Sequence, residues 1–466
     1  MSVSGEEVTI GLGAFGMLVA WWLGFSWMPG RAYLSGAQRA GFAYGLGLVW
    51  ISTMMGVLAV LGVPVTRMVG VVSIVGPPLG WWLWQTWRLR RVAEREVSVG
   101  VIRPVLSRDP WWWGLAALLG VLCAIVVVRA TVKPMYFWDG WATYALKAKI
   151  IYLEASVPRA IFDWVVAPNY PLGVPFQEVW VAWFAGSWDD VAVKLLFPGY
   201  ALALLCLVYG TLRDRWGARA AMGGTLFVAG LPFLLQHAQD AYTDLPLAYF
   251  VLGNAVALTR YALSSDRRDL VLASVFAAGL VWTREDGLIV VAANALLLAA
   301  LGARRGGLTS KTSVTAVGIY LAFPALVWGA WTLAKLHMGI STNLHVDSSD
   351  VMGLDRWQTI FEVFVRALFL QGNWMILWAL FSLVFVYEFR NTLTEESMFL
   401  VWPVVTYLVV IGVLVFMSEL FRFLWGDTVL HRLILHVAPL AALWVALTCG
   451  RWWGLAEPSP DVRGEG

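Results

Sequence analysis

Long apolar stretches separated by short polar ones dominate the pattern of the chain. Many of these stretches run for about 18 to 23 residues, the length that a helix needs to cross the roughly 30 Å hydrocarbon layer of a bilayer. The period-2 alternation that is typical of membrane β-barrel strands is absent from the sequence. The pattern therefore predicts an all-α polytopic membrane protein, because a helix satisfies its own backbone polar groups in lipid.

We expect about 13 membrane crossings, with boundaries uncertain by a few residues. Two neighbouring segments, 269–283 and 286–303, are short and could instead form a hairpin that does not cross fully. The expected spans are 9–28, 40–62, 66–87, 111–130, 190–211, 218–235, 244–263, 269–283, 286–303, 314–335, 372–390, 398–417 and 431–449.

Composition agrees with this assignment. Hydrophobic residues make up 60% of the 466 residues, charged residues make up 14%, and the mean hydropathy is +0.71. A soluble protein of this length would need more polar surface to cover its core. The three cysteines lie inside apolar runs without any motif spacing, so we expect them to pack in the core.

Basic residues are concentrated in five short connections. If the chain crosses at every expected span, all five connections fall on one side, which the positive-inside rule assigns to the cytoplasm. The two long loops, 131–189 and 336–371, then lie outside the cytoplasm, together with most of the clustered carboxylates and histidines. The basic residues are Arg31 and Arg39; Arg88, Arg90, Arg91 and Arg95; Arg213, Arg215 and Arg219; Arg260, Arg267 and Arg268; and Arg304, Arg305 and Lys311.

The stretch YFWDGWATYALKAKIIY at 136–152 directly follows one expected span and carries Asp139 among aromatic residues. Tyr144 and Lys147 follow at helical spacing, and Lys149 comes two residues later. Aromatic rings and lysines are common at membrane interfaces, so the stretch predicts an amphipathic helix along the interface. Two roles stay open for Asp139: the N-cap of that helix, or part of a functional site.

Further along the same loop, APNYPLGVP places Asn169 and Tyr170 among three prolines. Prolines at this density fix an extended, turning backbone and prevent a continuous helix. Such rigidity favours a binding loop, and a packed surface loop is the alternative.

The connector QHAQDAYTDLPLAYF places His237, Asp240 and Asp244 at i, i+3 and i+7, which predicts one shared face near a helix end. Pro246 follows closely, so Asp244 could also serve as a helix N-cap. Asp240 favours a wet cavity, because a carboxylate at the membrane boundary is costly elsewhere.

Two further stretches combine opposite charges at the outer ends of expected spans. WTREDG carries Arg284, Glu285 and Asp286, which could form a solvated turn or the floor of a cavity that binds an anionic head group. HRLILHVAP carries Arg432 and His436, four residues apart on one helix face. The planar fork of an arginine suits a phosphate, and snorkelling of Arg432 to the interface is the alternative.

The sequence lacks the motifs GxxxxGK[ST], HExxH and CxxC, and the GxGxxG match GLGAFG at 11–16 lies inside an expected membrane span instead of following a strand. Nucleotide hydrolysis, dinucleotide redox chemistry and zinc proteolysis therefore have no support. The histidines are few and scattered, so no metal ligand is assigned; a divalent cation held by carboxylates stays open. No nucleic-acid partner is expected.

Five stretches resemble, in order and spacing, the signatures of integral-membrane GT-C fold glycosyltransferases. The branch most similar is the bacterial one grouped with protein O-mannosyltransferases and aminoarabinose transferase (family 39-like), and the resemblance covers roughly residues 110–450. The stretches are WD…Y…KAK at 138–149, NYPLGVP at 169–175, AYTDLPLAYF at 241–250, WTREDG at 282–287 and HRLILHVAP at 431–439.

The resemblance implies a GT-C-type catalytic bundle in residues 106–450. Residues 1–105 would form three extra spans and a basic cytoplasmic linker, and residues 451–466 a disordered cytoplasmic tail. It also implies that a sugar passes from a polyprenyl-phosphate donor to an acceptor glycan, lipid or protein. The reaction would take place in a bacterial-type plasma membrane, on its extracytoplasmic side.

By the same resemblance, Asp139 matches the family's general base, and Arg284 or Arg432 the group that stabilises the departing phosphate. A single displacement with one base inverts the anomeric centre. Asp139 is followed by Gly140 where relatives carry an acidic pair, which puts a metal in doubt, and no large C-terminal soluble domain identifies the acceptor. The remaining expected substrate-binding residues are Tyr144, Lys147, Lys149, Asn169, Tyr170, His237, Asp240, Asp244, Glu285, Asp286 and His436.

Two other functions stay open. A transporter or flippase of a lipid-linked sugar would need polar residues at mid-span, whereas most spans here are apolar through their centres. An O-antigen polymerase or ligase relies on arginines in a large outer loop. The loop 336–371 contains the polar residues that such an enzyme would use, namely Arg356, Arg366, His337, His345, Asp347 and Asp350.

Overall fold

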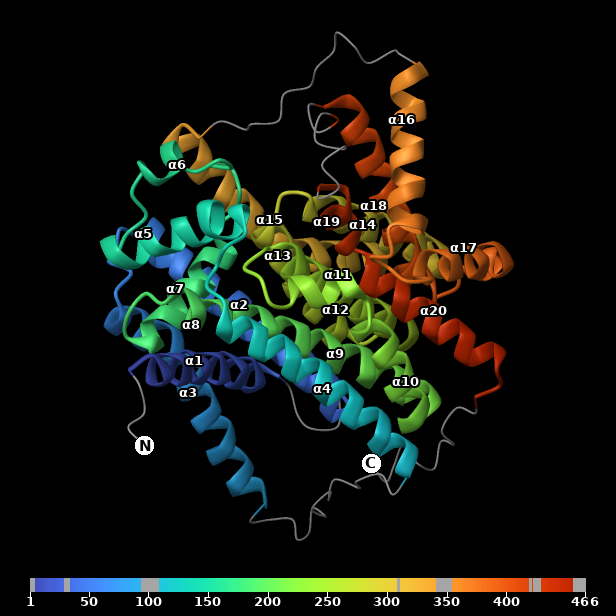
Figure 1. Cartoon of the computed structure of the whole chain (residues 1–466). Coiled ribbons are helices and arrows are strands. Elements are labelled where there is room, and N and C mark those ends of the chain that lie inside the picture. Colours follow the sequence, from blue (N-terminus) through green and yellow to red (C-terminus); the bar gives the residue numbers. More distant parts are fainter. Residues whose placement is uncertain are drawn as a thin grey trace.

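The computed structural model describes residues 5–28, 34–93, 109–307, 311–340, 354–418, 421 and 429–455. These residues form helices joined by short connections, and they contain no β-strand (Figure 1). The all-α fold predicted from the apolar pattern is therefore confirmed.

Each expected span coincides with one helix or with a pair of consecutive helices. Within the described ranges, seven helices are long and apolar enough to cross a membrane, or eight if the bent pair α19–α20 is one span. The count of about 13 crossings stays a prediction. The main helices at the expected spans, long or short, are α1 (Gly5–Trp27), α2 (Gly36–Val60), α3 (Arg67–Ala93), α4 (Pro110–Val132), α9 (Leu196–Trp216), α10 (Ala218–Ala229), α11 (Pro232–His237), α12 (Asp244–Ser264), α13 (Arg267–Thr283), α14 (Gly287–Gly306), α15 (Lys311–Met338), α17 (Leu377–Tyr387), α18 (Met398–Met417), α19 (Val429–Leu435) and α20 (Ala438–Trp452).

Short helices fill the two long loops. In the first loop, α7 is buried against α1 and α2, and the indole of Trp180 donates to the carbonyl of Gly16 at 2.9 Å. The stretch 136–152, expected as an interfacial helix, forms η1 and α5, in which Tyr144 and Lys147 are buried and Lys149 is exposed. The short helices are η1 (Gly140–Ala145), α5 (Leu146–Glu154), α6 (Ile161–Trp164), α7 (Gly173–Ala185) and α8 (Asp190–Lys194), followed in the C-terminal half by α16 (Leu354–Val365), η2 (Arg366–Leu370) and η3 (Phe389–Asn391).

Helix α12 lies at the centre of the bundle and is buried from Asp244 to Leu258. It packs against α9, α13, α18 and α20. Asn254, at its middle, donates to the carbonyl of Ala273 at 2.7 Å and accepts from the Asn294 amide at 2.8 Å. These bonds satisfy polar groups that would otherwise be costly inside the bundle. The central helix is thus held in one register relative to α13 and α14.

The two ends of α12 differ in chemistry. Near its last turn, Arg260 binds Asp269 at 3.0 Å, and the neighbouring connections are joined by the Arg305–Glu395 and Arg215–Glu396 ion pairs. The first residue of α12 is Asp244, some twenty residues away, which corresponds to about 30 Å at 1.5 Å per residue. These contacts gather several of the basic connections at one end. The side of the membrane that each end faces stays a prediction.

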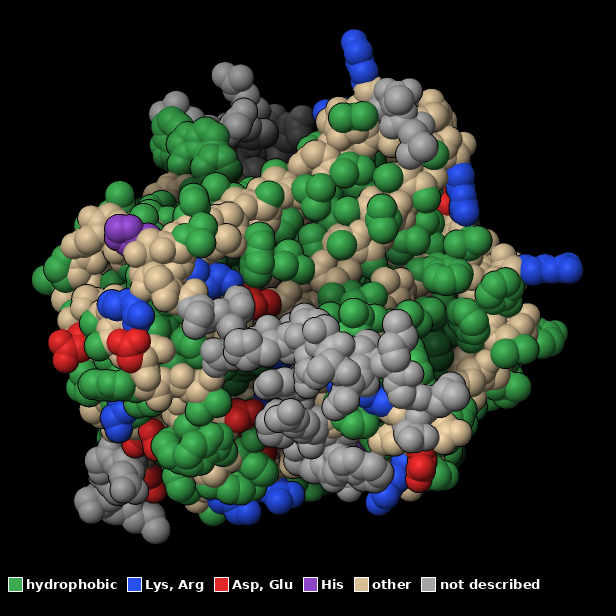
Figure 2. Space-filling view, turned by 90° about the horizontal axis from the view of Figure 1, so that it is seen from above, with side chains coloured by type: hydrophobic (Ala, Val, Ile, Leu, Met, Phe, Trp, Pro, Cys, Tyr) green, Lys and Arg blue, Asp and Glu red, His purple; other side chains and the backbone are tan. Residues whose placement is uncertain are grey.

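Hydrophobic side chains are spread over the face that is seen from above, and charged side chains occur there in small separate groups (Figure 2). At the opposite end of the molecule, α3 runs away from the bundle, as the lower part of Figure 1 shows.

Candidate functional site

Asp244 is the centre of a buried ion-pair network at one end of the bundle. Its carboxylate is fully buried and accepts hydrogen bonds from Arg284 Nη1 at 3.1 Å, Arg432 Nε at 3.0 Å and His436 Nε2 at 2.9 Å. The three donors come from the end of α13, from α19 and from the bend between α19 and α20. One carboxylate therefore joins the start of α12 to two segments, around Arg284 and around 432–436, that lie far from it in the sequence.

The local backbone explains how Asp244 reaches these partners. Helix α11 ends at His237, a turn follows, and Thr243 occupies the N-cap position of α12. The prediction that His237, Asp240 and Asp244 share one face near a helix end is therefore wrong. His237 ends α11, Asp240 lies in the connection and Asp244 begins α12. The N-cap role considered for Asp244 is also wrong, because its side chain binds the cations instead of the backbone.

Arg432 connects this buried carboxylate to a more exposed one. Its Nη1 binds Asp139 Oδ2, and its guanidinium lies over the Tyr242 ring at 4.4 Å. The side chain of Asp139 is 37% exposed, whereas that of Asp244 is fully buried. Asp139 occupies the N-cap position of η1 but makes no capping hydrogen bond. Of the two roles left open for Asp139, the structure fits membership of a charged site.

The WTREDG turn completes the network. Arg284 Nε binds Asp286 Oδ1 at 3.0 Å, and the Tyr407 hydroxyl donates to Asp286 Oδ2 at 3.0 Å. His436 Nδ1 faces the same Tyr407 hydroxyl and lies 3.4 Å from Asp286 Oδ2. The guanidinium of Arg284 also lies over the Tyr170 ring at 5.3 Å. Asp286 and Asp244 thus hold Arg284 through two different nitrogens of its guanidinium.

Lys147 anchors the proline-rich loop. Its ammonium group is buried and donates to the carbonyls of Ala167 at 2.8 Å, Tyr170 at 3.0 Å and Pro168 at 3.4 Å. Burial lowers the pKa of Lys147 to about 7. Three backbone acceptors surround this group, so its geometry does not fit the substrate-binding role expected for Lys147. Lys149 is exposed, and its expected substrate-binding role stays a prediction.

Asn169 and Glu285 link this loop to α15. The Asn169 amide donates to Glu285 Oε2 at 2.9 Å, and Lys335 binds the other oxygen of Glu285. The indole of Trp331 donates to the carbonyl of Asn169 at 3.2 Å. The ring of Tyr144 stacks on the ring of Tyr170, with 5.9 Å between the two ring centroids. The loop is therefore fixed from three sides.

His237 and Asp240 lie beside the network and make no hydrogen bond to Asp244. The buried His237 ring packs on Tyr242 at 5.3 Å, its Nδ1 faces the carbonyl of Phe233 at 3.1 Å, and burial lowers its pKa to about 4. Burial raises the pKa of Asp240 to about 6 although cations are near.

Sequence reasoning missed Tyr407, Trp331 and Lys335. Tyr407 and Trp331 lie within apolar spans, where an aromatic residue is the ordinary core filling. Lys335 could have been recognised in the sequence, because a lysine in the last turn of an apolar span needs a partner.

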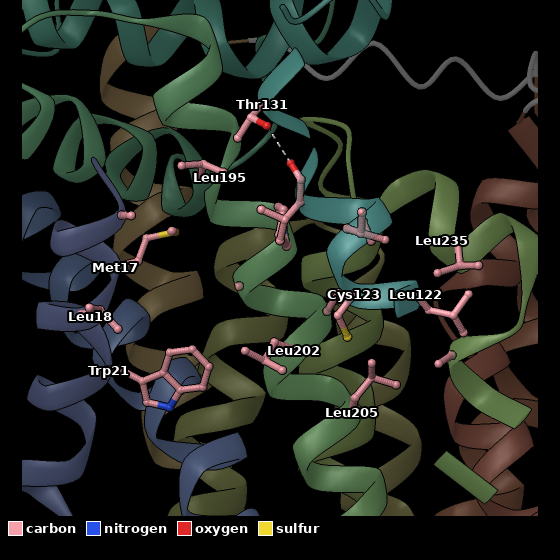
Figure 3. Close-up of a pocket in the computed structure, with 18 of the residues that line it drawn as sticks. Met17, Leu18, Trp21, Leu122, Cys123, Thr131, Leu195, Leu202, Leu205 and Leu235 are labelled. Carbon is pink, nitrogen blue, oxygen red and sulfur yellow. Dashed lines mark hydrogen bonds between the residues drawn. The ribbon is translucent and has the colours of Figure 1, made fainter. Parts of the chain in front are cut away.

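An apolar groove of about 430 Å³ lies between α1, α4, α9 and α11 (Figure 3). Thr131 lies at one end of the groove, and Trp21, Leu202 and Leu205 lie toward the other end. Ala238, at one edge, is followed by the connection that leads to Asp244. The backbone of that connection lies close to η1, since an added Cβ on Gly140 would be 3.2 Å from the Ala241 carbonyl oxygen. The groove therefore reaches the vicinity of Asp139.

Within the described ranges, no group of three or more histidine, cysteine or acidic side chains is arranged to hold a metal ion. At the network, arginines occupy the carboxylates that could have served as ligands. In the second long loop, His345, Asp347 and Asp350 lie outside the described residues. Arg356 donates to the carbonyl of Ser418 at 2.9 Å, and Arg366 is exposed.

The helical bundle, with a charged network at one end, has the architecture of an integral-membrane GT-C fold protein. Among solved structures, the chain is similar to the crystal structure of ArnT from Cupriavidus metallidurans bound to undecaprenyl phosphate. The TM-score is 0.50, the sequence identity is 15%, and the match covers 73% of this chain and 62% of that chain. This likeness supports the GT-C fold. No protein-family model and no curated protein matches the chain, and the expected relation to family 39 and to protein O-mannosyltransferases stays a prediction.

Proposed function

We propose that the protein transfers a sugar from a polyprenyl-phosphate donor to an acceptor at the Asp139 end of the bundle, by a single inverting displacement. The observation that carries this proposal is the pairing of Arg432 with both an exposed carboxylate, Asp139, and a buried one, Asp244. This arrangement offers a base and a phosphate-binding cation side by side. The similarity to a structure bound to undecaprenyl phosphate supports the class of donor.

The buried carboxylates fix the two arginines before any substrate binds. A guanidinium has five N–H donors, and the bonds to Asp244, Asp286 and Asp139 use Nε and Nη1 of each arginine. The remaining donors of Arg284 and Arg432 would bind the oxygens of a phosphate, where two parallel bonds are favourable. Their preorganised charge would stabilise the phosphate as it leaves.

Asp139 would act as the general base. In the proposed step, the acceptor hydroxyl oxygen attacks the anomeric carbon and its proton passes to Asp139. The bond between that carbon and the phosphate oxygen breaks, and its electron pair stays on the phosphate next to Arg432. A donor phosphate that draws Arg432 toward itself would release Asp139 Oδ2 for the acceptor. Donor binding would thereby prepare the base.

The apolar groove would hold part of the polyprenyl chain. It is lined by hydrocarbon from α1, α4 and α9, apart from Thr131 at one end. Its edge at Ala238 lies six residues before Asp244 along the chain. A lipid chain in the groove would keep its phosphate at the end of the bundle that carries the arginines. The expected extracytoplasmic location of this end belongs to the same proposal.

Turnover of a small panel of polyprenyl-phosphate sugars by the purified protein tests the proposal. Wild type should release free polyprenyl phosphate from one member of the panel. Arg432→Gln should lower kcat by 10²-fold or more, because one preorganised donor at a developing charge is worth about 10²–10³ in rate. Arg390→Gln, an exposed arginine at the other end of the bundle, should leave turnover unchanged. Movement of the intact donor across a bilayer without release would favour a flippase instead.

A further inference from the structure

A basic crevice opens at the end of the bundle opposite Asp244, where α12, α13, α14 and α15 meet. Its volume is about 470 Å³. Three cations from three different helices line it: Arg267 begins α13, Arg305 lies in the last turn of α14, and Lys311 begins α15. The deeper wall is apolar and consists of Tyr261, Leu270, Leu298, Leu301, Ala316 and Ile319.

The charges around the crevice leave an excess of positive charge. Within the described part of the chain, Arg305 is the only one of the three lining cations in an ion pair with a carboxylate, that of Glu395 at 2.8 Å. The two carboxylates at the start of α13 are both in ion pairs with other arginines, Asp266 with Arg268 at 2.6 Å and Asp269 with Arg260 at 3.0 Å. Arg267 and Lys311 are exposed.

We propose that this crevice binds one anionic glycerophospholipid. Basic pockets between membrane helices near the bilayer surface are suited to acidic lipid head groups. The phosphate would bind Arg267 and Lys311, with Arg305 at its side, because guanidinium groups form charge-assisted bonds with phosphate oxygens. An acyl chain would lie along the apolar wall. A free phosphate ion could use the same cations but would leave that wall uncovered, so the occupant is a lipid.

The crevice is linked to the charged network by the helices that form it. At their opposite ends, α12 begins with Asp244, α13 is followed by Arg284, α14 is preceded by Asp286, and Lys335 lies in the last turn of α15. A lipid that bridges all four helices would stabilise their packing. Binding to the folded state alone raises the free energy of unfolding by mass action.

Thermal unfolding of the full chain in a neutral detergent tests this inference. Phosphatidylglycerol should raise the midpoint of wild type by about 3 °C or more over an equal amount of phosphatidylcholine. In the double variant Arg267→Gln, Lys311→Gln the gain should fall to less than about half. The matched control Arg213→Gln, Arg390→Gln removes two exposed arginines from the same end of the bundle and should keep the full gain.

Native mass spectrometry supplies a second readout, in which wild type and the control retain one phosphatidylglycerol and the double variant does not. Equal gains in the double variant and the control would mean unspecific attraction to an acidic surface and would overturn the proposal. An equal gain from inorganic phosphate alone would also overturn it, since the site would then bind an ion and not a lipid. If the double variant does not fold, Lys311→Gln alone carries the comparison with Arg213→Gln.

Discussion

Replacing Asp244 by asparagine should destabilise the protein more than any loss of a surface charge. The substitution keeps the size of the side chain but removes the negative charge that faces Arg284, Arg432 and His436. Asp244 is fully buried, and the two arginine side chains are 9% and 17% exposed. Water therefore cannot replace the lost partner. Removing one member of a buried ion pair costs about 3–5 kcal/mol, because the other charge is left uncompensated.

The expected change in the melting temperature follows from this cost. At about 2 °C per kcal/mol, the lower end of the range for large domains, the apparent midpoint should fall by roughly 6–10 °C. The 29 tryptophans give a strong intrinsic fluorescence signal for such a measurement in detergent. Wild type and variant must be heated at one scan rate, because unfolding of a protein of this kind is often irreversible.

Asp163→Asn is the matched control. Asp163 pairs with Arg159 at 2.6 Å, but both side chains are about half exposed, at 59% and 46%. Surface substitutions of this kind usually change the free energy of unfolding by no more than about 0.5 kcal/mol. If Asp244→Asn melts within about 1 °C of Asp163→Asn, the buried network does not stabilise the fold and the reasoning fails.

Two predictions concern the proline-rich loop. Burial lowers the pKa of Lys147 from 10.5 to about 7, so the unfolded chain binds this proton more readily than the folded one. The melting temperature of wild type minus that of Lys147→Met should therefore rise as the pH increases from about 7 to about 9, and a constant difference would contradict the buried placement. Asn169→Asp would place a second carboxylate opposite Glu285, where Asn169 now donates at 2.9 Å. This substitution should lower the free energy of unfolding by about 1–3 kcal/mol and raise the KM for the donor. The control Asn169→Ser adds no charge and should have the smaller effect on both quantities. The reverse order would contradict the assigned hydrogen bond between Asn169 and Glu285.

The fold could be predicted from the sequence because the length of an apolar stretch determines whether a helix can cross a bilayer. The expected spans 244–263 and 398–417 coincide with α12 and α18 to within a residue. Interfacial placement was less predictable. Helix α7 is apolar on nearly every face, and only the position of α1 and α2 shows that it is buried.

Most residues of the candidate site could be predicted from the sequence, but their contacts with one another could not. Asp139 and Arg432 were both expected, yet they are 293 residues apart, and only the folded structure shows that Arg432 binds Asp139. Lys147 was assigned to a ligand because lysines at an interface usually face outward; the carbonyls of its own loop bind it instead. Tyr407 could not have been found, since an aromatic residue in an apolar span has many ordinary roles.

The central claim, that Asp139 is the base of a lipid-phosphate-dependent transferase, is tested most directly by Asp139→Asn. The measurement is the release of free polyprenyl phosphate from a sugar donor that wild type uses, together with donor binding and the melting temperature of both proteins. The account predicts that the variant folds, binds the donor and loses at least 10²-fold in kcat, in the range of general-base catalysis of about 10²–10⁴. Undiminished release by a folded Asp139→Asn protein would contradict it.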